Sequence, residues 1–320
     1  MDLLRLGFAC LAWPLALGGL AAAALAQGGR WSARLDVLTH FAPIYLAAGL
    51  LALGLAFLGP RAGRPALAAV SLLAVVGAAL LVAPEVLSRG GDPRAPANAS
   101  GRIKLIQFNS WGQNARTDAA AAWILAQEPD IVVLEEPGRL KAKLIASGYL
   151  AQCDCGAVIL SRQPALRRYA QPRSGDRPGF IAWATFAHPA GEFAVVAAHR
   201  YWPVRFARER AQTARLEGVI GALPRERMIV AGDFNSTPWS FARRREDRSW
   251  GLIRRTRALF TWPAARRSHN RLPAPFPWLP IDHVYAGPGW ATVAVARGPE
   301  LGSDHYPVVV TLAPSVSGAR

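Results

Sequence analysis

Three long uncharged stretches at the start of the chain limit most strongly what it can fold into. They are the 24 residues between Arg5 and Arg30, the twenty between His40 and Arg61, and the twenty between Arg64 and Glu85. All three are rich in Leu, Ala, Val and Gly, and each reaches the length of about 20 residues that a helix needs to cross a bilayer. Buried helices of a soluble protein are the alternative, but three in a row with almost no polar face favour a membrane. We therefore predict that residues 1–87 form a membrane anchor with three transmembrane helices.

The first stretch also fits a cleaved signal peptide. Met1–Arg5 could serve as its charged start, and Ala24-Leu25-Ala26 resembles a signal-peptidase site before Gln27. The length of the apolar run and Pro14 within it favour a retained helix. Both interpretations place the N-terminus in the cytoplasm.

The loop charges give only a small preference for one orientation. With the N-terminus inside, the cytoplasmic arginines are Arg5, Arg61 and Arg64, and the outer ones are Arg30, Arg34, Arg89 and Arg94. The count is nearly balanced, so the positive-inside rule does not decide between the two orientations. The densest basic turn, residues 59–65, mildly favours a cytoplasmic N-terminus.

A Gly/Pro/Ala-rich linker is predicted at residues 88–101, and the pattern changes after it. Residues 102–320 combine short β-like runs with helical stretches, which is enough chain for one layered domain. The predicted strands are Ile103–Phe108, Ile131–Leu134, Ala157–Leu160, Phe180–Phe186, Phe193–Ala198, Met228–Ala231, Val284–Ala286, Ala291–Ala296 and Pro307–Leu312. The predicted helices are Thr117–Gln127, Arg205–Leu223 and Trp239–Asp247.

Composition excludes several classes of protein and points to an anionic partner. A hydrophobic content of 52% excludes a disordered chain, and three cysteines exclude a disulfide framework. The net charge is +16, and all but three of the 37 basic residues are arginine. Many of these arginines would simply solvate the surface, but a positive field also attracts phosphorylated substrates. Arg200, directly after His199, is the best single candidate for a phosphate contact.

Polar residues gather where the predicted strands end. These strand ends carry Asn109, Glu135-Glu136, His199, Asp233 with Asn235, Asp282 and Asp304-His305. Each group alone fits a surface turn, but the set in this order is far more specific. Oxygen ligands of this kind suit a hard cation such as Mg²⁺ or Mn²⁺. Histidines beside aspartates can handle the protons and charge of phosphoryl chemistry.

These motifs resemble the endonuclease/exonuclease/phosphatase family, the DNase I-like proteins, over the whole region after the linker. Gly-Asp-Phe-Asn at 232–235 and Ser-Asp-His-Tyr-Pro at 303–307 are the sharpest parts of the resemblance. Three helices followed by residues 233–240, 261–263 and 280–284 are similar to its membrane-anchored bacterial branch. The resemblance implies an α+β fold, a four-layer αββα sandwich, behind the three transmembrane helices.

The resemblance also implies a role for each motif residue. Asn109, Glu136 and Asp304 would bind Mg²⁺ or Mn²⁺. Asp233 would orient or deprotonate the attacking water, Asn235 would hold a phosphate oxygen, and His199 would donate to the phosphate. His305 would act on the phosphate, with Asp282 fixing its tautomer.

The chain departs from the family pattern at two positions. Glu135 occupies the position where the family usually has Gln, which leaves open whether Glu135 or Glu136 points inward. Abasic-site endonucleases carry an acid two residues after the first Asn, whereas this chain has Trp111. The second departure argues against abasic-site cleavage, though not against hydrolysis.

Three functions are compatible with this pattern. The first is a membrane-anchored, metal-dependent phosphohydrolase acting on a phosphate ester or anhydride of a lipid-linked phosphate. The second is a membrane-tethered nuclease. The bases of its nucleic-acid substrate could stack on Trp202 or Trp239. The third is an anionic-lipid-binding module without catalytic activity. The full set of polar strand ends argues against it, because such a module needs no Asp-His pair. We expect the first, because three helices are an elaborate tether for a nuclease.

The same reasoning gives an expected location and set of partners. By analogy with the family branch, we expect a multi-pass protein of the bacterial cytoplasmic membrane with an extracytoplasmic catalytic domain. The partners would be a phosphorylated substrate, lipid-linked or nucleic acid, and membrane lipids. The sequence indicates no protein partner.

Overall fold

The computed structural model describes residues 3–87, 92–153, 155–172, 180–264 and 275–315. The chain divides into two compact units. The helical unit comprises Met1–Arg89 together with Ser236–Glu246, and the sandwich unit comprises Gly90–Asn235 and Asp247–Arg320. A short segment from the middle of the chain thus belongs with the N-terminal helices.

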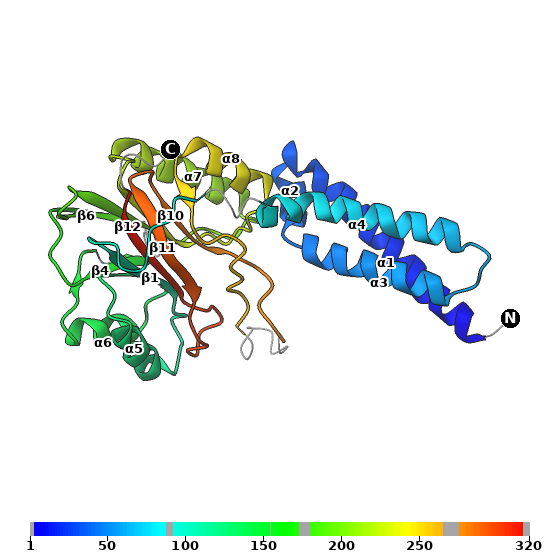
Figure 1. Cartoon of the computed structure of the whole chain (residues 1–320), viewed down its shortest axis with the longest axis horizontal. Helices are drawn as coiled ribbons and strands as arrows, with labels where there is room; N and C mark the ends of the chain where they lie inside the picture. Colours follow the sequence, from blue (N-terminus) through cyan, green and yellow to red (C-terminus); the bar gives the residue numbers. More distant parts are fainter. Residues whose placement is uncertain (1–2, 88–91, 154, 173–179, 265–274, 316–320) are drawn as a thin grey trace. The chain divides into compact units, whose positions relative to one another are not determined.

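The helical unit is built on helices that pack through small residues. Its N-terminal helices are α1 (Leu3–Gln27), α2 (Ala33–Thr39), α3 (Ala42–Leu58) and α4 (Arg64–Leu87). Helices α1, α3 and α4 run side by side (Figure 1). Buried alanines such as Ala16, Ala52 and Ala74 line their contacts, whereas leucines such as Leu50 and Leu72 are about half exposed. Small residues inside and large apolar residues outside are typical of helices that face lipid.

Two helical segments, Leu3–Arg30 and Arg64–Leu87, are long and apolar enough to cross a membrane. The predicted middle span corresponds to α3, which has 17 residues. It meets the same criteria only together with α2, and the pair bends by 55° at the break between them. The structure therefore supports two spans directly and a third only as a broken pair.

The sandwich unit contains two six-stranded sheets. The first has the strand order β11-β12-β1-β2-β4-β3 and the second β5-β6-β7-β8-β10-β9. The strands of the first are β1 (Ile103–Asn109), β2 (Ile131–Glu135), β3 (Leu150–Ala151), β4 (Ala157–Ser161), β11 (Trp290–Arg297) and β12 (Val308–Pro314). Those of the second are β5 (Arg167–Ala170), β6 (Ile181–Phe186), β7 (Phe193–Ala198), β8 (Met228–Asp233), β9 (Ile253–Arg254) and β10 (Asp282–Ala286).

Alternation along the strands produces four layers. Leu105 and Val133 of the first sheet share a buried cluster with Val195 and Ile229 of the second, which forms the core between the sheets. The opposite face of the first sheet packs on α5 (Thr117–Ala126) and α6 (Leu140–Ala146). The outer face of the second packs on α7 (Phe206–Ala222), and α5 and α7 lie on opposite sides of the sheets (Figure 1). This arrangement fits the expected α+β, DNase I-like fold.

All nine predicted strands are present, and the predicted helices correspond to α5, α7 and α8 (Phe241–Ser249). The short strands β3, β5 and β9 and the helix α6 were not predicted. Residues 88–91 of the predicted linker, including Arg89, lie outside the described residues. Pro93 and Ala95 hydrogen-bond to Thr292 of β11, so this part of the predicted linker is attached to the sandwich unit.

Candidate active site

Polar side chains end five central strands on the side facing the core between the sheets. Four of them lie two residues from an apolar residue of that core, and Asn109 lies two residues after the buried Gln107. Strand alternation therefore directs all five inward. They are Asn109 on β1, Glu135 on β2, His199 after β7, Asp233 on β8 and Asp282 on β10. Because β1 is parallel to β2 and β7 to β8, their carboxyl ends meet at one edge. Asp282 begins β10 directly opposite Asp233 in the antiparallel register.

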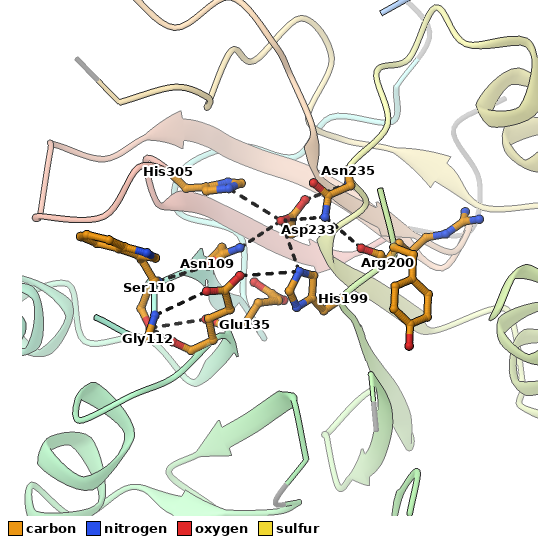
Figure 2. Close-up of polar contacts among 12 residues, drawn as sticks. Asn109, Ser110, Gly112, Glu135, His199, Arg200, Asp233, Asn235 and His305 are labelled. Carbon is orange, nitrogen blue, oxygen red and sulfur yellow. Dashed lines mark hydrogen bonds and ion pairs between the residues drawn. The ribbon is translucent and has the colours of Figure 1, made fainter. Parts of the chain in front are cut away.

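Asp233 lies at the centre of this group and is 1% exposed. Its Oδ2 accepts a hydrogen bond from Asn109 Nδ2 at 3.0 Å, which joins the two sheets. The Nε2 atoms of His199 and His305 both lie 3.7 Å from the same oxygen. Figure 2 shows these side chains converging on Asp233.

The Gly-Asp-Phe-Asn motif has a structural reason for its first and last residues. A Cβ on Gly232 would lie 1.8 Å from the carbonyl oxygen of Ala198 on β7, so only glycine fits there. Asn235 has a φ of 48°, in the left-handed region that asparagine tolerates best after glycine. The backbone N–H of Asn235 donates to Asp233 Oδ1 at 2.8 Å, and its Nδ2 donates to the Arg200 carbonyl at 2.9 Å. The turn therefore fixes the rotamer of Asp233.

A hydrogen-bonded chain orients His305. The Nδ1 of His305 lies 2.8 Å from Asp282 Oδ2, and Asp282 Oδ1 accepts a bond from Gln107 Nε2 at 2.9 Å. Gln107 also donates to Glu135 Oε2 at 2.8 Å. With Nδ1 held by the carboxylate, the Nε2 of His305 is left facing Asp233.

The two neighbouring glutamates have different environments. Glu135 is fully buried on β2 and held by Gln107. Glu136 follows the strand with a φ of 46°, and its side chain is 43% exposed. Its Oε1 lies 4.0 Å from His199 Nε2, and its Oε2 accepts a weak bond from the Gly112 N–H at 3.5 Å. Glu135 thus points inward, whereas Glu136 reaches the edge of the site through the bend in the chain.

Arg200 and Asp304 lie at the margin of the group. The Arg200 guanidinium is buried and paired with Glu209 of α7, and the Arg200 carbonyl accepts the bond from Asn235 Nδ2. The Asp304 Oδ2 accepts a bond from the Trp262 indole at 3.2 Å. Of the predicted site residues, the structure brings together Asn109, Glu136, His199, Asp233, Asn235, Asp282 and His305.

Burial and crowding shift the ionisation of the central groups. Burial raises the pKa of Asp233, with His305 opposing the rise and Asp282 adding to it. Burial also raises the pKa of Glu135 well above its usual range, and Asp282 adds to this effect. For His305, burial alone would lower the pKa, but Asp282 and Asp233 outweigh it and raise the pKa to about 10. The imidazole is therefore held as a cation in the protein alone.

This donor set fits a divalent cation. Asp233, Asp282 and His305 each offer a ligand atom, and these atoms lie within 4.8 Å of one another. Glu135 Oε1 is buried without a hydrogen-bond partner in the described part of the chain. Two buried carboxylates side by side carry charge that a hard cation would offset, and carboxylate oxygens are its preferred ligands.

The roles of two supporting residues were not predicted. Gln107 precedes Asn109 by two positions and therefore shares its face, and a buried amide inside an apolar strand was the available indication. Ser303 donates from Oγ to the Asn109 carbonyl at 2.7 Å and accepts a bond from the His305 N–H at 3.1 Å. Its role depends on the return of the chain to β1, which no local pattern reveals.

Comparison with known proteins agrees with this arrangement. Among solved structures, an endonuclease/exonuclease/phosphatase from Beutenbergia cavernae has a TM-score of 0.52 at 21% identity, covering 68% of this chain and 72% of that one. Humanized D. rerio TDP2 has a TM-score of 0.50 at 18% identity, with 67% and 99% covered. The human nocturnin catalytic domain has a TM-score of 0.50 at 16% identity, with 70% and 96% covered. At these identities the likeness establishes the fold alone.

No curated protein matches the chain. Residues 106–305 match the sequence model of a family whose members hydrolyse phosphoester bonds. This range includes every strand-end residue described above. The chain belongs to the Endonuclease/Exonuclease/phosphatase family.

Proposed function

We propose that this protein is a membrane-anchored, divalent-metal-dependent phosphohydrolase that cleaves a phosphate ester or anhydride of a lipid-linked phosphate. One observation carries the hydrolytic part: Asp233 is held between Asn109 of one sheet and Asn235 of its own turn, with two imidazoles 3.7 Å from it. The apolar helices of residues 3–87 support the membrane-anchored part.

Asp233 is the proposed base. Its raised pKa makes it a better proton acceptor than an exposed aspartate, and its hydrogen bonds fix the direction in which it faces an attacking water. Asn235 would hold a phosphate oxygen.

The two histidines would meet the charge that develops on phosphate. His305, kept cationic by Asp282, presents Nε2 toward the reacting group, and His199 donates from the other side of Asp233. Asp282 orients His305 without touching the substrate.

Asn109, Glu136 and Asp304 are the proposed ligands of Mg²⁺ or Mn²⁺. The cation would neutralise phosphate charge when bound. The Arg200 guanidinium is not assigned to the phosphate, because Glu209 already occupies it.

A two-substrate assay on the full chain in detergent tests this function. Phosphate release from a polyprenyl pyrophosphate and cleavage of plasmid DNA are followed in the same buffer with Mg²⁺ or Mn²⁺, with Asp233→Asn as the inactive control. Metal-dependent phosphate release with intact plasmid is the expected result. Plasmid cleavage without phosphate release would make the protein a tethered nuclease, and inactivity on both would refute the proposed function.

We place the protein in the bacterial cytoplasmic membrane, with the sandwich unit outside the cytoplasm. Residues 27–40 pack with residues 237–242 inside the helical unit, so both segments lie on the same side. A cytoplasmic N-terminus with α1 spanning the membrane puts that side outside. Alkaline phosphatase fused after Arg320 would then be active, whereas activity confined to a cytoplasmic reporter would reverse the orientation.

A further inference from the structure

The segment that follows the Gly-Asp-Phe-Asn turn is built into the helical unit. The chain leaves the sandwich unit after Asn235, and residues Ser236–Glu246 pack with the N-terminal helices before the chain returns at Asp247. Only one peptide bond separates this segment from Asn235, which in turn donates two hydrogen bonds to Asp233. The segment is therefore joined directly to the turn that holds Asp233.

Asp36 of α2 fixes the start of α8. Its side chain is buried, and its Oδ1 accepts a bond from the Phe241 N–H at 2.8 Å. Its Oδ2 accepts bonds from the Ala242 N–H and the Ser240 hydroxyl, both at 2.9 Å. The first N–H groups of a helix have no partner within the helix, and a carboxylate there also meets the positive end of the helix dipole.

No acidic residue of α8 lies in its own first turn, so the charge at this end comes from Asp36. Ser240 supplies the next acceptor, since its Oγ accepts the Arg243 N–H at 3.3 Å. The start of α8 is thus shared between its own cap residue and a residue about 200 positions earlier in the chain.

His40 holds the turn before α8. Its Nδ1 lies 2.7 Å from the Thr237 hydroxyl and 3.3 Å from the Thr237 N–H, and both side chains are buried. Thr237 is two residues after Asn235. Hence two residues of the helical unit, Asp36 and His40, bind the segment at both of its turns.

Gly29 shows that this contact is close. A Cβ at this position would lie 2.7 Å from the Asp36 Cα and 3.0 Å from the Phe241 ring. The Arg30 guanidinium lies over the same ring, 5.2 Å from its centroid. The turn between α1 and α2 is therefore shaped to receive the start of α8.

We infer that Asp36 and His40 are positioning residues for hydrolysis, because they hold Ser236–Glu246, which continues directly from the Asn235 turn that fixes the rotamer of Asp233. The membrane helices are then part of the support of the site and not only a tether. The expected change in kcat rests on the proposed hydrolase activity. The contact between Asp36 and the segment is measured separately, by trypsin digestion.

The test compares Asp36→Ala and Asp36→Asn with wild type in the full chain. The matched control is Ser71→Ala, which removes a buried bond from Ser71 Oγ to the Leu67 carbonyl within α4. Hydrolysis of the polyprenyl pyrophosphate and of plasmid DNA gives kcat and KM. Limited trypsin digestion, mapped by mass spectrometry, reports cleavage after Arg243–Arg245.

We expect Asp36→Ala to lower kcat by roughly 10–100-fold, the usual effect of losing a supporting partner, with little change in KM. Trypsin should cut the segment faster in this variant. Asp36→Asn should be intermediate in both readouts, because one carbonyl oxygen can still accept, and Ser71→Ala should match wild type in both.

Three results would overturn the inference. They are an unchanged trypsin pattern in Asp36→Ala, a faster cut with unchanged kcat, and an equal loss of kcat in Ser71→Ala. If wild type hydrolyses neither substrate, the proposed function fails by itself. Mn²⁺ affinity then replaces kcat: weaker binding in Asp36→Ala alone, with faster cleavage, supports the positioning role, and equal binding refutes it.

Discussion

Asp233 and Asp282 differ from Glu136 and Asn235 in what holds them. The aspartates lie on paired strands opposite each other and are 1% and 0% exposed, so the sheet register sets their positions. Glu136 and Asn235 each follow a strand end with a positive φ, and their bonds with the Gly112 N–H and the Arg200 carbonyl reach other parts of the chain. Strand positions are therefore rigid and predictable, whereas loop positions depend on neighbours that must be supplied from elsewhere in the chain.

The largest expected effect is at the strand position Asp233. Asp233→Asn keeps the shape and burial of the side chain but removes the proton acceptor, so kcat should fall by roughly 10²–10⁴-fold. The melting temperature should fall modestly, because an amide offers one acceptor oxygen to the three donors that now bond to the two Asp233 oxygens. Steady-state hydrolysis gives kcat, and thermal unfolding followed by tryptophan fluorescence gives the melting temperature. Turnover near wild type would remove Asp233 from the mechanism.

Glu136→Gln and Glu135→Gln form a matched pair of variants. They test whether the glutamate after the strand or the glutamate on the strand binds the cation. Glu136→Gln weakens a proposed cation ligand, so turnover should fall by at least the roughly 100-fold that outer partners cost, with partial recovery at high Mn²⁺. Glu135→Gln should stay within a few-fold of wild type. Burial already raises the pKa of Glu135 towards the neutral form, and Gln107 can donate to an amide oxygen as well.

A Mn²⁺ titration of activity in the two variants decides the assignment. If Glu135→Gln lost turnover and Glu136→Gln kept it, the inward carboxylate would be the cation ligand. The exposed glutamate would then be a surface residue.

Gln107→Leu should have a smaller effect, because Gln107 acts only through its neighbours. It donates to both Asp282 and Glu135, so its loss leaves two buried carboxyl groups without a shared donor. We expect kcat to fall by roughly 10–100-fold with little change in KM. A rise in KM with unchanged kcat would contradict a role in orienting His305. Gln107→Glu would separate lost hydrogen bonding from lost volume.

Much of the sandwich could be predicted because strand alternation and strand ends are local patterns. The predicted strand Phe193–Ala198 has the observed bounds, and Asp233 and Asp282 are where their motifs indicated. Short strands such as β3 and β9, each two residues long, exist only through their partners, so no run of residues indicates them.

What the local patterns left open has a common physical cause, which is pairing between distant residues. Arg200 fits a phosphate contact by its position after His199, but Glu209 on α7 takes its guanidinium. Asp36 is one acid among apolar helices, and its role depends on α8, some 200 residues later. Choosing between Glu135 and Glu136 required knowing where β2 ends and that φ turns positive there.

The smallest expected effect is on stability against pH and concerns His305. Its pKa is about 10 in the folded chain against 6.5 for the free side chain, so folding favours the protonated form. That stabilisation is complete below about pH 6.5 and is lost as the pH rises towards 10. In EDTA, the difference in melting temperature between wild type and His305→Gln should be largest near pH 6 and shrink steadily to pH 10. A constant difference over that range would show that the charge on His305 does not depend on Asp282 and Asp233. The strand pair would then orient the imidazole without controlling its proton.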